Sequence, residues 1–155
     1  MMDVYAKMKE LGITLPNPPA KGGLYTPAKE FGKGLVYVSG CGPAIDGPIT
    51  GKLGKDFTAE EGERLARNCM LNVLAVLQAQ IGDLNRVKTA VKILTFVAST
   101  DDFTLQPAVA NGGSQLIIDL FGKAAARSAI GVNVLPGDMP VESEVLFELK
   151  EEETV

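Results

Sequence analysis

Apolar residues recur along the chain at the two spacings that distinguish helices from strands. Between Leu65 and Ile81 they return every three or four residues, which predicts a long helix with one buried face. Thr58 stands three residues before Glu61, the spacing of a capping box, so we expect this helix to begin after Thr58 and to end at Gly82. A shorter helix is expected at the N-terminus, over residues 3–11.

A second long helix is expected after the sequence STDDF, with Pro107 in its first turn and Gly122 just past its end. Its interior contains Gly112 and Gly113, which cost about 2 kcal/mol relative to two alanines. Some other interaction must offset this cost. Either the backbone approaches a neighbouring element closely at the two glycines or the helix breaks there, and the sequence leaves both alternatives open.

Four segments have the composition or the alternation of β-strands: residues 34–40, 87–98, 127–135 and 139–149. The last two flank the turn-forming sequence PGDMP, which predicts an antiparallel hairpin. The order of the elements indicates an α+β fold, with both long helices on one face of a sheet. The other face is expected to carry Arg127 and the glutamates of the last strand, and its partly apolar character predicts oligomerisation.

The length of 155 residues and the hydrophobic content of 46% fit a single domain over residues 1–155. Residues 1–24 are expected to form its N-terminal helix and a Pro/Gly-rich arm. No secretion signal and no apolar run of membrane-spanning length is present in the sequence. Because the two cysteines make at most one bridge, a reducing compartment fits best, and we expect a cytoplasmic protein without membrane contact.

The charged residues argue against several classes of function. The net charge is −4, and no stretch carries the lysine and arginine stripe that a phosphate backbone requires, which argues against nucleic-acid binding. The chain has no histidine and no C-x-x-C pair, so we expect no metal and no cofactor. Cys41 is a candidate nucleophile only if a base activates it, and no histidine exists to do so.

Five stretches in order, GGLYTPAK, GLVYVSGCGP, FVASTDDF, AARSAIGV and VLPGDMPVESEV, together resemble the RidA/YjgF family, also called endoribonuclease L-PSP-like. The similarity runs from about Leu15 to Leu149. The longer N-terminal arm resembles that of the family branch whose substrates are mostly unassigned. The resemblance implies a chorismate-mutase-like α+β fold with a mixed sheet. It also implies a homotrimer with a cleft at each of the three subunit boundaries.

The resemblance implies roles for individual side chains. In family members that act as deaminases, the arginine of the A-R-S segment, here Arg127, pairs with the carboxylate of 2-iminopropanoate or its enamine. The family's glutamate fifteen residues further on, here Glu142, orients the attacking water. The tyrosine of the early segment corresponds to Tyr25, and the S-G that closes the first long strand corresponds to Ser39 and Gly40.

The sequence departs from the deaminase pattern at two further substrate-binding positions. Ala129 stands where a cysteine is common, although the backbone carbonyl carries most of the role given to that position. Asn111 is shifted by one residue from the asparagine of the family's second helix. These departures leave the roles of Arg127 and Glu142 in place and leave the substrate open.

The implied activity is hydrolysis of a reactive enamine or imine to a keto acid and ammonia. This reaction does not need histidine, because a positioned carboxylate can take the proton of the attacking water, for a factor of roughly 10² to 10⁴ in rate. The second hypothesis is a non-catalytic trimer that binds a small carboxylate metabolite. The third is an endoribonuclease, and the negative net charge of the chain argues against it. Without the resemblance, Arg127 would be an ion-pair residue, Glu142 a solvated strand residue and Tyr25 a packing residue.

Overall fold

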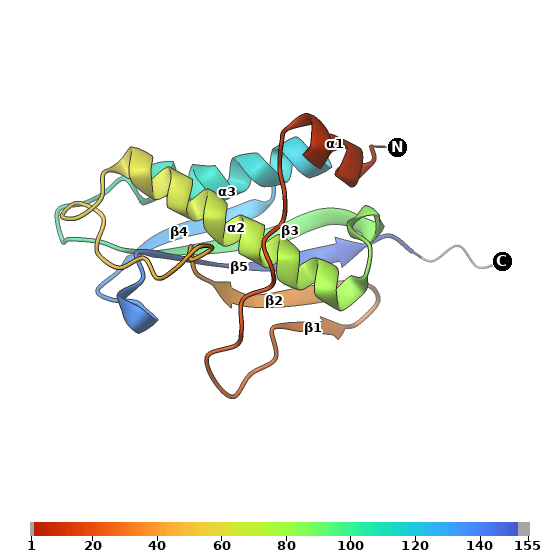
Figure 1. Cartoon of the computed structure of the whole chain (residues 1–155), viewed down its shortest axis with the longest axis horizontal. Helices are drawn as coiled ribbons and strands as arrows, with labels where there is room; N and C mark the ends of the chain where they lie inside the picture. The colour runs from red at the N-terminus through yellow and green to blue at the C-terminus, as the bar shows by residue number, and fades with distance from the viewer. Residues whose placement is uncertain (1, 152–155) are drawn as a thin grey trace.

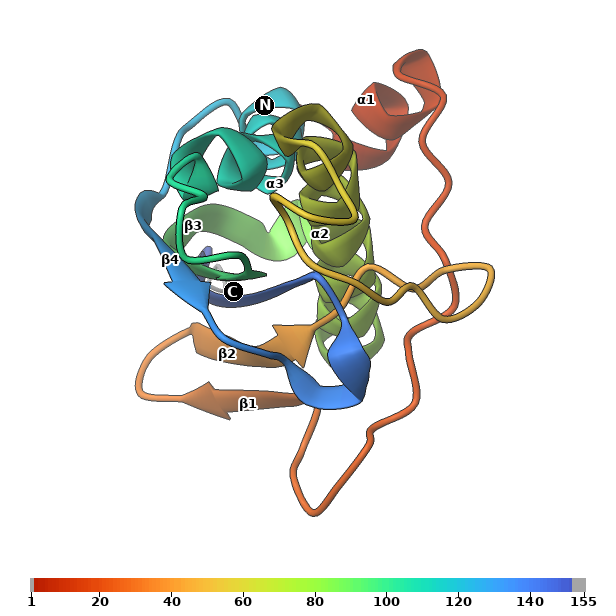
Figure 2. The same ribbon diagram turned by 90° about the vertical axis from the view of Figure 1, so that its left-hand side faces the viewer.

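The computed structural model describes residues 2–151 as one sheet with two long helices on one of its faces (Figure 1, Figure 2). This arrangement confirms the expected α+β class. No helix among the residues described is long and apolar enough to span a bilayer. The elements are, in chain order, α1 (Val4–Glu10), β1 (Ala28–Phe31), β2 (Leu35–Cys41), α2 (Ala59–Ile81), β3 (Val87–Ala98), α3 (Gln106–Phe121), β4 (Ala126–Val132) and β5 (Val141–Leu149).

Helix α2 has the predicted ends. The Thr58 hydroxyl accepts a hydrogen bond from the Glu61 N–H at 3.2 Å, and the Glu61 carboxylate accepts one from the Thr58 N–H at 2.7 Å, so the capping box is formed. The helix ends at Gly82, whose φ of 83° lies in the region that glycine adopts without strain. One face of α2, including Met70, Val73, Leu74 and Leu77, is fully buried. Most of its stability therefore comes from packing against the sheet.

The two glycines of α3 mark a close approach between helices. A Cβ at Gly112 would collide with the backbone carbonyl of Glu63 and lie 3.1 Å from the backbone nitrogen of Arg67, both in α2. The helix is continuous from Gln106 to Phe121. The first of the two open alternatives is therefore correct: the glycines let the backbones of α2 and α3 pack against each other, and the helix does not break.

The strand order β1-β2-β5-β3-β4 contradicts the expected hairpin. Strand β5 lies between β2 and β3 and is antiparallel to both, whereas β4 pairs only with β3 and runs parallel to it. The reason is the crossover: β3, α3 and β4 form a βαβ unit, which returns the chain beside β3 in the same direction. Residues 133–140 then carry the chain to the other side of β3. Strand β1 has no counterpart among the expected strands, because AKEF is short and its two central residues are charged.

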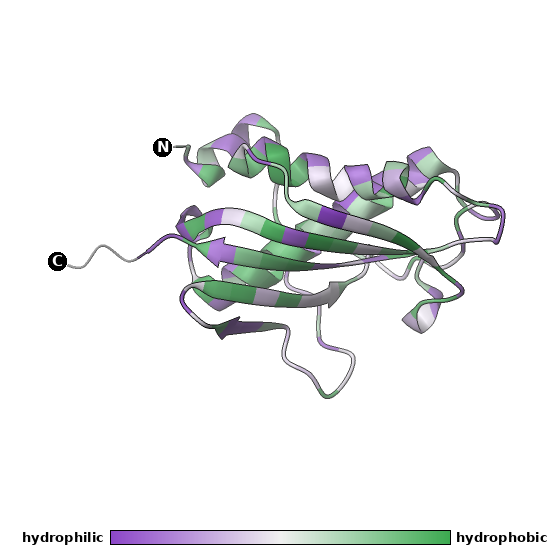
Figure 3. Ribbon diagram, turned by 180° about the vertical axis from the view of Figure 1, so that it is seen from behind, coloured by the Kyte–Doolittle hydropathy of each residue, from purple (hydrophilic) through white to green (hydrophobic). Residues whose placement is uncertain are grey.

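The helices cover one face of the sheet and leave the other open. Along β5, Val141, Ser143, Val145 and Phe147 are buried beneath the helices, and the alternate residues Glu142, Glu144, Leu146 and Glu148 point to the open face. Figure 3, which views the sheet from the side away from α2, shows hydrophobic and hydrophilic residues alternating along its strands. The open face includes two partly exposed apolar side chains, Tyr37 and Ile130.

The close approach at Gly112 gives a prediction about stability. Alanine is the better helix former by about 1 kcal/mol, yet Gly112→Ala should destabilise the protein by about 2 kcal/mol or more, because its methyl group would overlap backbone that cannot move aside. Urea unfolding measures the difference. The matched control is Gly113→Ala, whose Cβ would meet its nearest neighbours, one of them the flexible Met70 side chain, at 3.3 Å. If both variants were equally stable, the helix contact would not explain the glycines.

Candidate functional site

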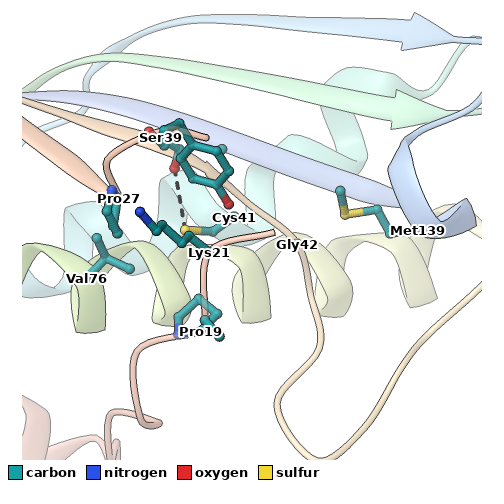
Figure 4. Close-up of a pocket in the computed structure, with 11 residues that line it drawn as sticks. Pro19, Lys21, Pro27, Ser39, Cys41, Gly42, Val76 and Met139 are labelled. Carbon is teal, nitrogen blue, oxygen red and sulfur yellow. Dashed lines mark hydrogen bonds between the residues drawn. The ribbon is translucent and has the colours of Figure 1, made fainter. Parts of the chain in front are cut away.

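The end of β2 and the N-terminal arm enclose a cavity of about 160 Å³ (Figure 4). Tyr25, Ser39 and Gly40, three of the expected substrate-binding residues, all line it. The remaining wall comes from α2, through Val76, and from the segment before β5, through Met139. The structure therefore brings these three residues together, and their role in binding a substrate stays a prediction. The other lining residues are Pro19, Ala20, Lys21, Pro27, Cys41 and Gly42.

A β-bulge positions Ser39 and Gly40. Val38 pairs with Val145 and Cys41 with Ser143, so β2 has one more residue than β5 over this stretch. The Ser39 backbone N–H donates to the Pro27 carbonyl at 2.9 Å, and the Ser39 hydroxyl donates to the Thr26 carbonyl at 2.7 Å. These two bonds attach the arm to the bulge. The arm's position beside the cavity thus follows from the local geometry of β2.

Glu142 lies directly against the bulge at Gly40. A Cβ at Gly40 would overlap the Glu142 carboxylate, so only glycine leaves room for this side chain. Burial, and secondarily the negative charge of Glu144, raise the pKa of the Glu142 carboxyl above its ordinary value. A raised pKa brings a carboxylate closer to the value that suits a general base near neutral pH.

The cysteine of the cavity is not activated. Burial, and secondarily the charge of Glu142, raise the pKa of the Cys41 thiol to about 12, so the sulfur stays protonated at neutral pH. The thiol donates to the Ser39 carbonyl at 3.5 Å. The geometry therefore gives no support to a nucleophilic Cys41. Within residues 2–151, no group of three or more metal-ligating side chains gathers at any point.

Arg127 faces the helices, which corrects the expectation that it lies on the open face with the glutamates. Its Nη1 donates to Asn111 Oδ1 at 2.8 Å and to Ser114 Oγ at 3.1 Å, both in α3. The reason is that β4 is an edge strand beside α3, where a long polar side chain reaches the helix without entering the core. Because both protons of Nη1 are used, Nη2 and Nε form the fork that remains for a carboxylate.

Ser114 is the residue that sequence reasoning missed. It stands three positions after Asn111, so the two side chains project from neighbouring positions on one side of α3. That spacing is the only signal the sequence offers. Asn111 itself accepts a hydrogen bond from Arg127, so the two residues lie side by side in this structure. Ala129 lies two residues after Arg127, on the same face of β4.

One chain does not bring Arg127 and Glu142 together. Arg127 pairs with Ile93, which is buried beneath the helices, whereas Glu142 pairs with Phe96 and points to the open face. The two side chains also stand three residues apart along β3. The structure therefore holds two separate groups of candidate residues: Arg127 with Asn111, Ser114 and Ala129, and Glu142 with Gly40, Ser39 and Tyr25.

The raised pKa of Glu142 predicts how stability depends on pH. In the unfolded chain this carboxyl loses its proton near the ordinary value of 4.5, while the folded protein keeps the proton to a higher pH. Its stabilising contribution is therefore complete below pH 4.5 and is lost as the pH rises through the folded pKa. We expect Glu142→Gln to remove this decrease in the free energy of unfolding, measured by urea at fixed protein concentration.

Glu144→Gln serves as the second variant. Removing the negative charge of Glu144 should lower the pKa of Glu142, so the free energy of unfolding should decrease less as the pH rises. A wild-type protein whose pH dependence matched that of Glu142→Gln between pH 4 and 8 would contradict the raised pKa.

Comparison with known proteins identifies the family to which the chain belongs. The family model described as "YjgF/chorismate_mutase-like, putative endoribonuclease" matches residues 6–152. Protein TCP17 of Trypanosoma cruzi is 44% identical over 151 residues, covering 94% of each chain. The crystal structure of Atu1372 from Agrobacterium tumefaciens, a protein of unknown function, is 36% identical with a TM-score of 0.85, over 95% of this chain and 93% of that one.

A structure with lower sequence identity has a similar fold. TdcF of E. coli, solved with bound serine, is 22% identical with a TM-score of 0.63, over 88% of this chain and 96% of that one. At this identity the likeness concerns the fold alone. The family match over nearly the whole chain and the identity to TCP17 together show that this protein belongs to the RidA/YjgF family.

Proposed function

We propose that this protein hydrolyses a carboxylate-bearing enamine or imine, such as 2-iminopropanoate, to the keto acid and ammonia, in a cleft between subunits of a homotrimer. The observation that carries the proposal is the separation of Arg127 from Glu142 on opposite faces of the sheet. A site that uses both groups must combine the helix side of β4 from one chain with the bulge of β2 from a neighbour. The partly apolar open face, with Tyr37 and Ile130, supports such an assembly.

Arg127 would anchor the substrate. Its free fork of Nη2 and Nε matches the two oxygens of a carboxylate, and the bonds to Asn111 and Ser114 hold the guanidinium in one orientation before the substrate arrives. A fixed anchor places the C=N carbon at a defined distance from the base, which supplies part of the rate enhancement. Lysine cannot reproduce this planar, two-point contact.

Glu142 would act as the general base. The substrate reacts as the protonated iminium ion. The water oxygen adds to the C=N carbon while the Glu142 carboxylate takes one water proton, which leaves a neutral carbinolamine with an –NH2 group. Glu142 then gives that proton to the nitrogen, the C–N bond breaks so that ammonia leaves with the electron pair, and the hydroxyl proton passes to solvent as the carbonyl forms. Each step needs only one group that exchanges a proton at a pH near neutrality, and the raised pKa of Glu142 suits this task. No metal or other cofactor is required.

A carboxylate-binding protein without turnover is the second candidate. The observation that favours it is that the anchor, Arg127 with Asn111 and Ser114, is complete within one chain. The fold also accommodates a carboxylate-bearing molecule in the TdcF structure with bound serine. The endoribonuclease activity named in the family description has less support, because the chain carries a net charge of −4. The buried, free cysteines are in keeping with a reducing cytoplasm as the place of action.

Turnover of 2-aminoacrylate separates these candidates. The compound is generated with a PLP-dependent dehydratase, and keto-acid release is followed against the rate in buffer. We expect the wild-type protein to accelerate release, Glu142→Gln to lower kcat by about 10² or more, and Arg127→Lys to raise KM by about tenfold, equivalent to about 1.4 kcal/mol of binding. The matched controls are Glu148→Gln, on the same strand and face as Glu142, and Arg64→Lys on α2.

Both controls should retain wild-type kinetics. Release no faster than in buffer would remove the deaminase assignment. Tight binding of a keto acid that depends on Arg127 and not on Glu142, without turnover, would establish the second candidate instead.

A further inference from the structure

A single charged side chain, Lys21, lines the cavity at the end of β2. Figure 4 shows it extending from the arm among the other lining residues. The walls around it are mostly apolar, as at Pro19, Val76 and Met139, and the Cys41 thiol stays neutral because burial raises its pKa. Lys21 is therefore the one charged side chain among the residues that line the cavity, and the Glu142 carboxylate lies close by, against Gly40.

The ammonium group of Lys21 has no hydrogen bond or ion pair with any other residue in the range 2–151. The loop that carries it is nevertheless ordered by its own contact, because the Gly22 backbone N–H donates to the Tyr25 hydroxyl at 3.0 Å. The Gly42 backbone, which lines the cavity, is held by the buried Asn72 amide, which donates to the carbonyls of Gly42 and Ala44 at 2.9 Å each. An unpaired cation beside a preformed hollow favours an anionic group there.

We propose that Lys21 makes this site selective for 2-imino acids whose side chain ends in a second carboxylate. The inference rests on the proposed function, in which Arg127 holds the α-carboxylate and Glu142 faces the C=N carbon. Gly40 both contacts the Glu142 carboxylate and lines the cavity, so we place the rest of the substrate in the cavity, toward Lys21. A methyl group, as in 2-iminopropanoate, carries no charge that could pair with the lysine, whereas a side chain ending in a carboxylate does.

Binding of two stable keto acids tests this selectivity without turnover. Isothermal titration calorimetry compares 2-oxoglutarate, which carries the second carboxylate, with pyruvate, which does not. We expect the wild-type protein to bind 2-oxoglutarate at least about tenfold more tightly, and Lys21→Gln to bring the two dissociation constants within about twofold. Lys21→Arg should keep the preference. Lys29→Gln, on the exposed strand β1, is the matched control and should leave both constants unchanged.

A wild-type protein that binds both keto acids equally, or neither, would overturn the assignment to Lys21, as would a preference that survives in Lys21→Gln. These outcomes are independent of the turnover assay. If 2-aminoacrylate is hydrolysed and the preference is absent, the deaminase assignment stands and the selectivity fails. If nothing is hydrolysed but the preference depends on Lys21, the cavity selects diacids in a protein that binds without turnover.

Discussion

The alternation of side chains across a β-sheet is the constraint on which this account depends. Because β4 and β5 flank β3, Arg127 and Glu142 occupy neighbouring parts of one sheet, yet their positions assign them to opposite faces. No side-chain rotation within one chain moves a group through the sheet. A reaction that uses both side chains at one substrate therefore requires a second copy of the chain, and the proposed trimer would supply it.

Two places where glycine permits close packing connect the fold to the two groups of residues. At Gly112 the backbones of α2 and α3 come together, and the neighbouring Asn111 and Ser114 are thereby held where they orient Arg127. At Gly40 the bulge in β2 leaves space for the Glu142 carboxylate, whose burial raises its pKa. The proposed anchor and the proposed base are thus each positioned by a backbone feature, which fixes their geometry within the chain.

Local signals in the sequence were enough to predict the helices, since caps, periodicity and terminal glycines act over a few residues. Strand pairing was predicted wrongly, because PGDMP favours a hairpin locally while the crossover through α3 decides which strand lies beside β3. The face of Arg127 depended on that pairing and was wrong for the same reason. The grouping of Tyr25, Ser39 and Gly40 followed from family resemblance, whereas Ser114 and Lys21 became visible only from contacts in three dimensions.

Mixing inactive subunits tests most directly whether one site is built from two chains. Arg127→Ala and Glu142→Gln chains are denatured, combined in equal amounts and refolded, and the imine-hydrolysing activity of the mixture is compared with that of each variant alone. If every site takes its arginine from one subunit and its glutamate from the next, random assembly makes about a quarter of the sites intact. The account predicts recovery of about a quarter of wild-type activity. A mixture as inactive as its components would contradict it.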